Sequence, residues 1–175
     1  MYHPVTTEFS SLQQKVKNLV SALMDSKKNY IVVYPNNDYG SEIILSEYKR
    51  FDNNEHFRVF PSIRFECFLT MLKNAEFMIG NSSAGIRETG VYGIPTIDLG
   101  SRQHGRYVLE NSNIQHVNED YTEILEAIGQ IDRYGKINLS YGKGNSTEQF
   151  IEILRKNETW DFEIQKKFVD IHSTL

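Results

Sequence analysis

Three polar runs that contain glycine have residue types suited to binding a phosphate or a nucleotide. The first, residues 80–88, reads Gly-Asn-Ser-Ser-Ala-Gly-Ile-Arg-Glu and follows a β-rich run at the start of a predicted helix. Its small residues let a ligand approach the backbone, a helix N-terminus offers N–H groups to an anion, and Ser82 and Ser83 add hydroxyl donors. We expect a phosphate or diphosphate here. The alternative is that a serine simply caps the helix.

Charged side chains lie within the first run and in the second. Glu88 is five residues beyond Ser83, where a carboxylate can accept both hydroxyls of a ribose; alternatively it is a solvated helix residue. The second run, residues 100–106, reads Gly-Ser-Arg-Gln-His-Gly-Arg and places Arg102 and Arg106 four residues apart. A guanidinium at this position can bind a diphosphate through two N–H groups. The alternative is a pair of surface arginines.

The third run, residues 34–41, reads Tyr-Pro-Asn-Asn-Asp-Tyr-Gly-Ser. Asn36 and Asn37 can form hydrogen bonds with a base or a sugar. The competing interpretation is an Asx-type turn followed by a helix cap at Ser41.

Metal and nucleophilic chemistry lack residues at suitable spacing. No two of the five histidines pair at ligand spacing, and a single cysteine, Cys67, excludes an internal disulfide and a cysteine-based zinc site. The sequence shows no Ser-His-Asp order and no nucleophile elbow. We therefore expect a binding site with no metal and without a complete catalytic apparatus.

The elements that must position these runs alternate between strand and helix patterns. Strands are expected at 30–34, 57–60, 77–79, 96–99 and 114–117, and helices at 8–24, 41–51, 64–75, 121–131 and 147–154. This alternation is typical of βαβ units, so we predict an α/β fold with a Rossmann-like, doubly wound parallel sheet of five or six strands. Ligands bind at the carboxyl ends of such strands, where all three runs lie. His3 to Thr6 resembles the end of a strand, and we expect the chain to begin within one.

Length and composition indicate an ordinary globular domain. The chain has 175 residues, 39% of them hydrophobic, and 19 basic against 23 acidic residues give a net charge of −4. This mildly acidic balance argues against a nucleic-acid or membrane-surface partner. The N-terminus lacks a secretory signal and no apolar run is long enough to span a membrane, so we expect a cytoplasmic protein.

Taken together and in order, the motifs resemble the hydrolysing UDP-N-acetylglucosamine 2-epimerases, most closely the branch of the sialic-acid pathway. The resemblance runs from His3 to about Leu154, and it rests on residues 3–8, 34–41, 80–88, 93–95, 100–106 and 141–145. It implies a glycosyltransferase-B-like architecture of two Rossmann-like domains, of which this chain is the C-terminal one. Residues 1–155 would be the UDP-binding domain and residues 156–175 a C-terminal helical tail.

The resemblance also implies a role for each site residue. Ser82 and Ser83 would hold the diphosphate and Arg102 would pair with it. Glu88 would take the ribose hydroxyls, and Ile63 would face the uracil. Two further residues complete the set: Asn36 would line the nucleotide pocket, and His3 would lie at the floor of the cleft in a supporting catalytic role.

In the family that the chain resembles, UDP is eliminated from the sugar to give a 2-acetamidoglucal, and hydration then yields N-acetylmannosamine. No metal or redox cofactor takes part, and the proton-transferring carboxylates belong to the N-terminal domain. The implied partners are UDP or UDP-N-acetylglucosamine, the missing N-terminal domain, and further copies of the full-length protein in a homo-oligomer. This chain alone should be inactive. Alternatives are the nucleotide half of a glycosyltransferase, a non-hydrolysing epimerase and a stand-alone UDP-binding module.

Overall fold

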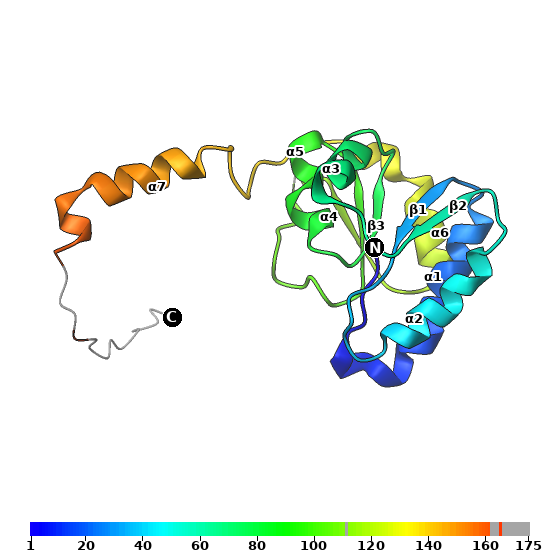
Figure 1. The fold of residues 1–175 in the computed structure, drawn as a ribbon. Coiled ribbons are helices and arrows are strands. Elements are labelled where there is room, and N and C mark those ends of the chain that lie inside the picture. The colour runs from blue at the N-terminus through cyan, green and yellow to red at the C-terminus, as the bar shows by residue number, and fades with distance from the viewer. Residues whose placement is uncertain (111, 162–164, 166–175) are drawn as a thin grey trace, which may run out of the picture. The chain divides into compact units, whose positions relative to one another are not determined.

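A computed structural model describes residues 1–110, 112–161 and 165 of the chain. It divides into two compact units, Met1–Leu139 and Ser140–Leu175, which are described separately (Figure 1). Within the described residues, no helix is both long and apolar enough to cross a membrane.

The strands of the first unit are all parallel and match the five expected from the sequence to within a residue. Two of them, β1 and β2, form one hydrogen-bonded ladder, and the other three form a second ladder in the order β3-β4-β5. Their bounds are Tyr30–Val33 for β1, Phe57–Phe60 for β2, Met78–Gly80 for β3, Thr96–Leu99 for β4 and Ile114–Val117 for β5. The predicted α/β class with parallel strands is thus confirmed.

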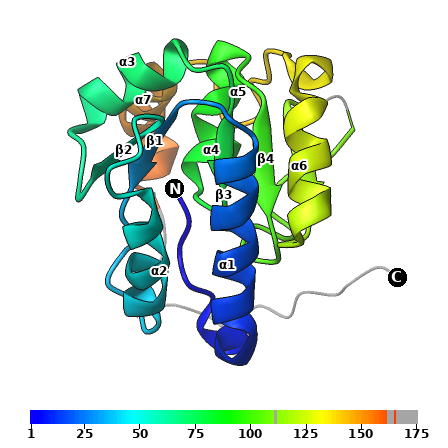
Figure 2. The ribbon, with the colours of Figure 1, turned by 90° about the vertical axis from the view of Figure 1, so that its right-hand side faces the viewer.

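Helices cover both faces of the strands, as predicted. On one face α1 packs against α2 and α6, and on the other α3 packs against α5 (Figure 2). The bounds are Phe9–Asp25 for α1, Ser41–Tyr48 for α2, Phe65–Lys73 for α3, Ala84–Arg87 for α4, Thr89–Tyr92 for α5 and Tyr121–Gly129 for α6. Short 3-10 turns occupy Thr6–Glu8, Lys49–Phe51 and Ile131–Tyr134. The run at residues 80–88, expected to open one helix, instead leads into two one-turn helices, α4 and α5.

The core of the first unit is built around α1, whose apolar residues recur every three or four positions. Leu12, Val16, Leu19 and Val20 are at most 2% exposed and meet Ile97 and Leu99 of β4 in one cluster. Burying a side chain of this size contributes about 1.5–3 kcal/mol relative to leaving it exposed. This face of α1 therefore fixes the helix against the strands whose ends carry the polar runs.

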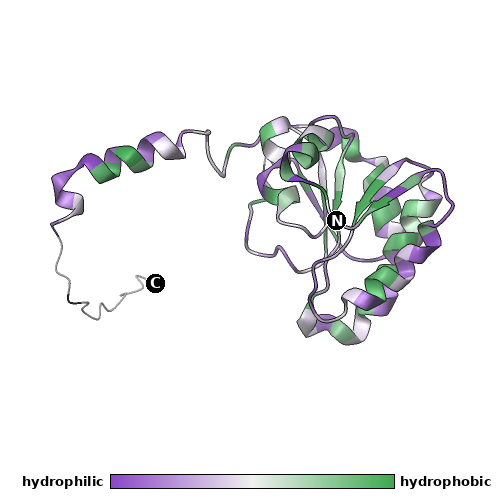
Figure 3. Cartoon of the chain, in the orientation of Figure 1, coloured by the Kyte–Doolittle hydropathy of each residue, from purple (hydrophilic) through white to green (hydrophobic). Residues whose placement is uncertain are grey.

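The second unit contains α7 (Ser146–Arg155), which alternates apolar and polar residues (Figure 3), and a 3-10 turn at Asn157–Thr159. The turn closes back on α7, because Thr159 Oγ1 donates to the carbonyl of Ile153 at 2.6 Å and Trp160 Nε1 to that of Leu154 at 2.9 Å. Of the helical tail expected at 156–175, residues 162–164 and 166–175 lie outside the described residues. The expected division at residue 155 stays a prediction.

Candidate functional site

Asn81, directly after β3, is the centre of a buried polar cluster. Its side chain is fully buried and pairs twice with the backbone of His3: Oδ1 accepts from the N–H at 2.7 Å, and Nδ2 donates to the carbonyl at 2.8 Å. The Asn81 carbonyl accepts from Arg102 Nη1 at 3.1 Å and from Gln103 Nε2 at 2.8 Å. One residue thus joins the N-terminal segment to the loops that follow β3 and β4.

His3 connects this cluster to the run at the end of β1. The backbone N–H of Asn36 donates to His3 Nδ1 at 3.0 Å, so the ring proton of the neutral imidazole lies on Nε2. Burial, followed by the positive charge of Arg102, lowers the pKa of His3 to about 4. At neutral pH His3 is therefore an uncharged hydrogen-bond donor rather than an imidazolium acid.

Ser82 and Ser83 lie at the carboxyl end of β3, beside Asn81. The Ser82 hydroxyl accepts weakly from the N–H of Ala84 at 3.4 Å. Ser83 is the N-cap residue of α4, but its side chain makes no capping hydrogen bond, which leaves the hydroxyl to a ligand. Since α4 has only one turn, its macrodipole is small, and hydroxyl and guanidinium donors are the main groups that can hold an anion here.

Arg102 is half-buried and is oriented by its bond to the Asn81 carbonyl, whereas Arg106 is exposed and donates to Gln103 Oε1 at 3.4 Å. The two arginines therefore do not act as an equivalent surface pair. A guanidinium has five N–H donors in a planar fork, so Arg102 can anchor to the backbone and still bind a phosphate.

Two of the predicted site residues are not bonded to this cluster. Among the described residues, no hydrogen bond or ion pair joins Glu88 or Ile63 to Asn81. Glu88 is half-buried between α4 and α5, burial raises the pKa of its carboxyl, and its Oε2 is buried with no hydrogen-bond partner. Ile63 lines an apolar groove beside β1. The ribose and uracil roles of these residues stay predictions.

A second polar group lies on the ladder of β4 and β5. The register places Asp98 opposite His116, Tyr107 donates to Asp98 Oδ2 at 2.6 Å, and His116 Nε2 lies 3.1 Å from His104 Nε2. Burial raises the pKa of Asp98, while Tyr107 and His116 act against that rise. No group of three or more histidine, cysteine or carboxylate side chains among the described residues is arranged to hold a metal.

The sequence interpretation missed two members of the main cluster, Asn81 and Gln103. Both stand inside the polar runs, but their importance lies in burial and in partners 78 and 22 residues away, which spacing does not reveal. The one local signal in the sequence is the position of Asn81, an amide directly after a predicted strand.

Parallel strands with polar side chains gathered at their carboxyl ends define an α/β domain of the kind in which nucleotide-binding folds place their ligands. A family model described as UDP-N-acetylglucosamine 2-epimerase matches residues 1–155. The chain belongs to this family.

Three curated relatives agree with this assignment. The chain is 44% identical to a UDP-N-acetylglucosamine 2-epimerase of Neisseria meningitidis, over 98% of this chain and 46% of that protein. It is 27% identical to a UDP-N,N'-diacetylbacillosamine 2-epimerase (hydrolyzing) of Legionella pneumophila, over 89% of this chain and 41% of that protein. It is 37% identical to the polysialic acid biosynthesis protein P7 of Escherichia coli, over 61% of this chain and 28% of that protein. The chain thus spans less than half the length of each of these relatives.

Among solved structures, the chain resembles UDP-GlcNAc 2-epimerase from Neisseria meningitidis bound to UDP-GlcNAc. The TM-score is 0.67 at 14% identity, covering 81% of this chain and 40% of that one. At this identity the likeness shows the fold alone, which is the glycosyltransferase-B type expected from the sequence.

Proposed function

We propose that this chain is the UDP-binding part of a hydrolysing UDP-N-acetylglucosamine 2-epimerase, which releases N-acetylmannosamine and UDP for sialic acid biosynthesis. The observation that carries the proposal is the buried Asn81 cluster, which gathers His3, Asn36 and Arg102 from three separate runs. The family assignment, a relative described as hydrolyzing and another described by polysialic acid biosynthesis support it.

In this proposal the diphosphate lies at the end of β3, against the hydroxyls of Ser82 and Ser83 and the guanidinium of Arg102. Asn36 lines the nucleotide pocket beside it. Glu88 accepts the ribose hydroxyls: its Oε2 lacks a protein partner, and two O–H donors would supply what that oxygen lacks. Ile63 faces the uracil.

The chemical task of these residues is to stabilise charge on the departing UDP. Arg102 neutralises the diphosphate, and His3 donates from Nε2 without itself carrying a charge, which is electrostatic stabilisation in a partly desolvated site. Proton transfers at the sugar need carboxylates placed against it. We assign those to an N-terminal domain outside this chain, in a cytoplasmic enzyme that is a homo-oligomer at full length.

Calorimetric titration of UDP into the chain tests the binding role. Arg102→Ala should weaken UDP at least about tenfold, because a bidentate charged contact is lost, and Glu88→Ala should also weaken it. Arg133→Ala is the matched control, since this arginine is exposed and its side chain donates to Gln130 Oε1, three residues before it in the chain; the variant should leave affinity within about twofold. Equal affinity for Arg102→Ala and Arg133→Ala would refute the placement of the diphosphate.

Product analysis tests the reaction. When full-length protein is incubated with UDP-N-acetylglucosamine and no acceptor, NMR should detect free N-acetylmannosamine and UDP as the products. Accumulation of UDP-N-acetylmannosamine would show a non-hydrolysing epimerase instead, and a strict need for an acceptor would show a glycosyltransferase.

A further inference from the structure

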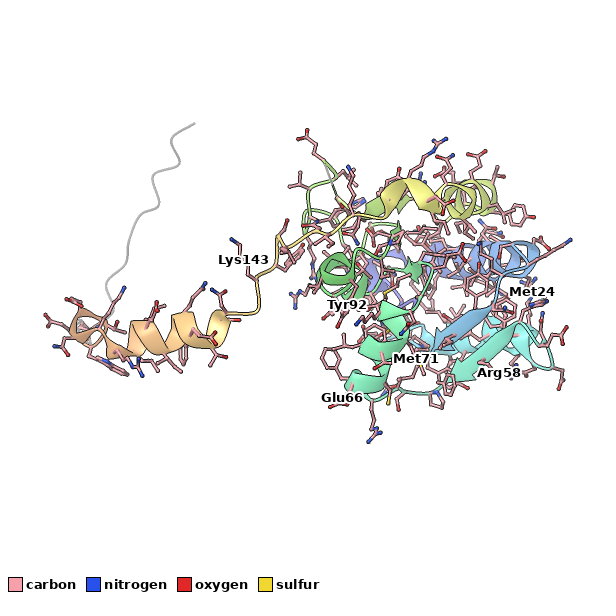
Figure 4. The ribbon with its side chains drawn as sticks, turned by 90° about the horizontal axis from the view of Figure 1, so that it is seen from above. Met24, Arg58, Glu66, Met71, Tyr92 and Lys143 are labelled. Atoms are coloured by element: carbon pink, nitrogen blue, oxygen red, sulfur yellow. The ribbon has the colours of Figure 1, made fainter. Side chains whose placement is uncertain are left out.

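A pair of histidines from β5 and the loop after β4 brings two ring nitrogens together. Nε2 of His104, in that loop, lies 3.1 Å from Nε2 of His116 on β5, although the two residues are 12 positions apart in the chain. His104 is exposed and the side chain of His116 is 26% exposed, so both rings are open to solvent. Seen from above in Figure 4, the loop after β4 (yellow-green) projects from the first unit on the side opposite α3, which Glu66 and Met71 mark. An ion can therefore reach the pair directly from water.

The geometry of the two rings suits a shared metal ion. Their centroids lie 4.8 Å apart at an interplanar angle of 57°, which is closer than two rings meeting head-on through these nitrogens would allow. The rings are therefore tilted, and their nitrogen lone pairs can converge on a point beside the line that joins them. A zinc–nitrogen bond is about 2.0–2.1 Å long, so nitrogens 3.1 Å apart subtend an angle of about 100° at the metal, between the octahedral and tetrahedral values.

Tyr107 and Asp98 determine which nitrogen of His116 carries the ring proton. Nδ1 of His116 lies 3.3 Å from the Tyr107 hydroxyl and 3.5 Å from Oδ2 of the buried Asp98. Because the Tyr107 hydroxyl donates its own proton to Asp98 at 2.6 Å, it can only accept from His116. Nδ1 of the neutral ring therefore bears the proton, and Nε2 presents a lone pair to His104. A carboxylate behind a histidine is the arrangement that orients metal-binding imidazoles.

His104 supplies the second lone pair. In the hydrogen-bonded pair its Nε2 is the donor, because Nε2 of His116 has no proton. When that proton moves to Nδ1 of the same ring, both Nε2 lone pairs face the gap between the rings. Two imidazole nitrogens favour Zn²⁺, Ni²⁺ or Cu²⁺ over Mg²⁺ or Ca²⁺. Since no third histidine, cysteine or carboxylate in the described part of the chain joins the pair as a ligand, water fills the other positions.

We propose that His104 and His116 bind one divalent transition-metal ion through their Nε2 atoms, and that Asp98 is a positioning residue behind His116. The ion joins the loop after β4, which carries Arg102, to β5. The inference goes beyond the proposed function, because no step of UDP release is assigned to the ion.

Calorimetric titration of Zn²⁺ into the chain tests the site. Wild type should bind one ion that His104→Gln and His116→Gln each weaken at least about tenfold, because loss of a ligand costs no less than the 10–100-fold typical of an outer partner. His56→Gln is the matched control, since this exposed ring lies 2.8 Å from Asn29 Oδ1; it should keep the affinity within about twofold. Equal affinity in wild type and all three variants would overturn the proposal and leave a pair that is only hydrogen-bonded.

Nitrogen-15 NMR of the histidine rings tests the same site without relying on a variant. Added Zn²⁺ should shift Nε2 of His104 and His116 while Nδ1 of both rings stays protonated. Shifts confined to other histidines would refute the assignment. Asp98→Asn should reduce the preference of His116 for the Nδ1 proton and weaken Zn²⁺ about tenfold or more, a change of tautomer that a purely structural role would not produce.

Thermal unfolding gives a third measurement. Zn²⁺ should raise the Tm of wild type and of His56→Gln but not of His104→Gln, because an ion that binds only the folded chain stabilises it. His104 is exposed, so its replacement should not impair folding. A Zn²⁺-dependent Tm that is the same in all three proteins would contradict the site. No nucleotide enters these measurements, so their outcome is separate from that of the UDP titration.

Discussion

At the scale of single residues, Asn81 holds together backbone segments that are far apart in the sequence. Asn81→Ala leaves the N–H and carbonyl of His3 without partners in a buried setting, which should lower the free energy of unfolding by about 2–4 kcal/mol. Urea unfolding measures this loss. Asn74→Ala is the control, because that side chain is exposed and donates to the carbonyl of Thr70 in the adjoining α3; it should cost about 0.5 kcal/mol or less. Equal losses for the two variants would contradict the role given to Asn81.

His3 makes the folded state sensitive to acid. Its pKa falls from 6.5 to about 4 on folding, so between these values the unfolded chain binds more protons and stability declines as the pH falls. With allowance for partial solvent screening, the loss is about 1–2 kcal/mol. His3→Gln keeps an acceptor for Asn36 but does not titrate, so its unfolding free energy should fall less from pH 6.5 to 4. Because the Met1 amine is present in both proteins, it does not affect the comparison. If the free energy of unfolding changed with pH in the same way for wild type and variant, the linkage to His3 would be ruled out.

At the scale of the elements, β3 ends on a glycine at a position where a side chain does not fit. Gly80 has a φ of 138°, and a Cβ built there would lie 1.8 Å from the carbonyl oxygen of Met1. Gly80→Ala should therefore cost about 3–5 kcal/mol, from backbone strain and displacement of the N-terminal segment. Gly129→Ala at the end of α6 faces open space and should be neutral or stabilise by up to about 1 kcal/mol. Thermal unfolding of both variants compares them directly, and a tolerated Gly80→Ala would show that the segment is free to move.

All five strands and the longer helices were predictable because each carries its own pattern, whereas the two one-turn helices α4 and α5 were not. The run Tyr30–Val33 and the helical spacing of Leu12, Val16 and Leu19 identify a buried strand and a core-facing helix locally. Contacts between elements were not predictable in this way. Asp98 and His116 lie opposite each other because β4 and β5 pair in register, and no interval along the chain reveals that pairing.

For the site, sequence reasoning found the polar runs and their strand-end positions but not their connections. Four of the predicted residues, His3, Asn36, Ser82 and Arg102, share or adjoin the cluster built on Asn81. The role of Asn81 follows from its burial and its distant partners, and the sequence carries no direct record of burial at a polar residue.

At the scale of the whole molecule, the chain spans less than half the length of its relatives, and its main cluster has groups that stabilise charge but few that move protons. Arg102 offers only N–H donors, and His3 is neutral at pH 7, with Nδ1 occupied by the N–H of Asn36 and only the Nε2–H left to donate. Elimination of UDP needs a base and an acid against the sugar.

We therefore expect the isolated chain to bind UDP yet release no N-acetylmannosamine from UDP-N-acetylglucosamine, as followed by NMR over hours at pH 7. The full-length protein under the same conditions should form product, and its His3→Gln variant should lose part of kcat while keeping some activity, since a neutral donor is replaced by another. If the isolated chain turned over UDP-N-acetylglucosamine and His3→Gln abolished that turnover, His3 itself would transfer the proton. The assignment of proton transfer to an N-terminal domain would then be wrong.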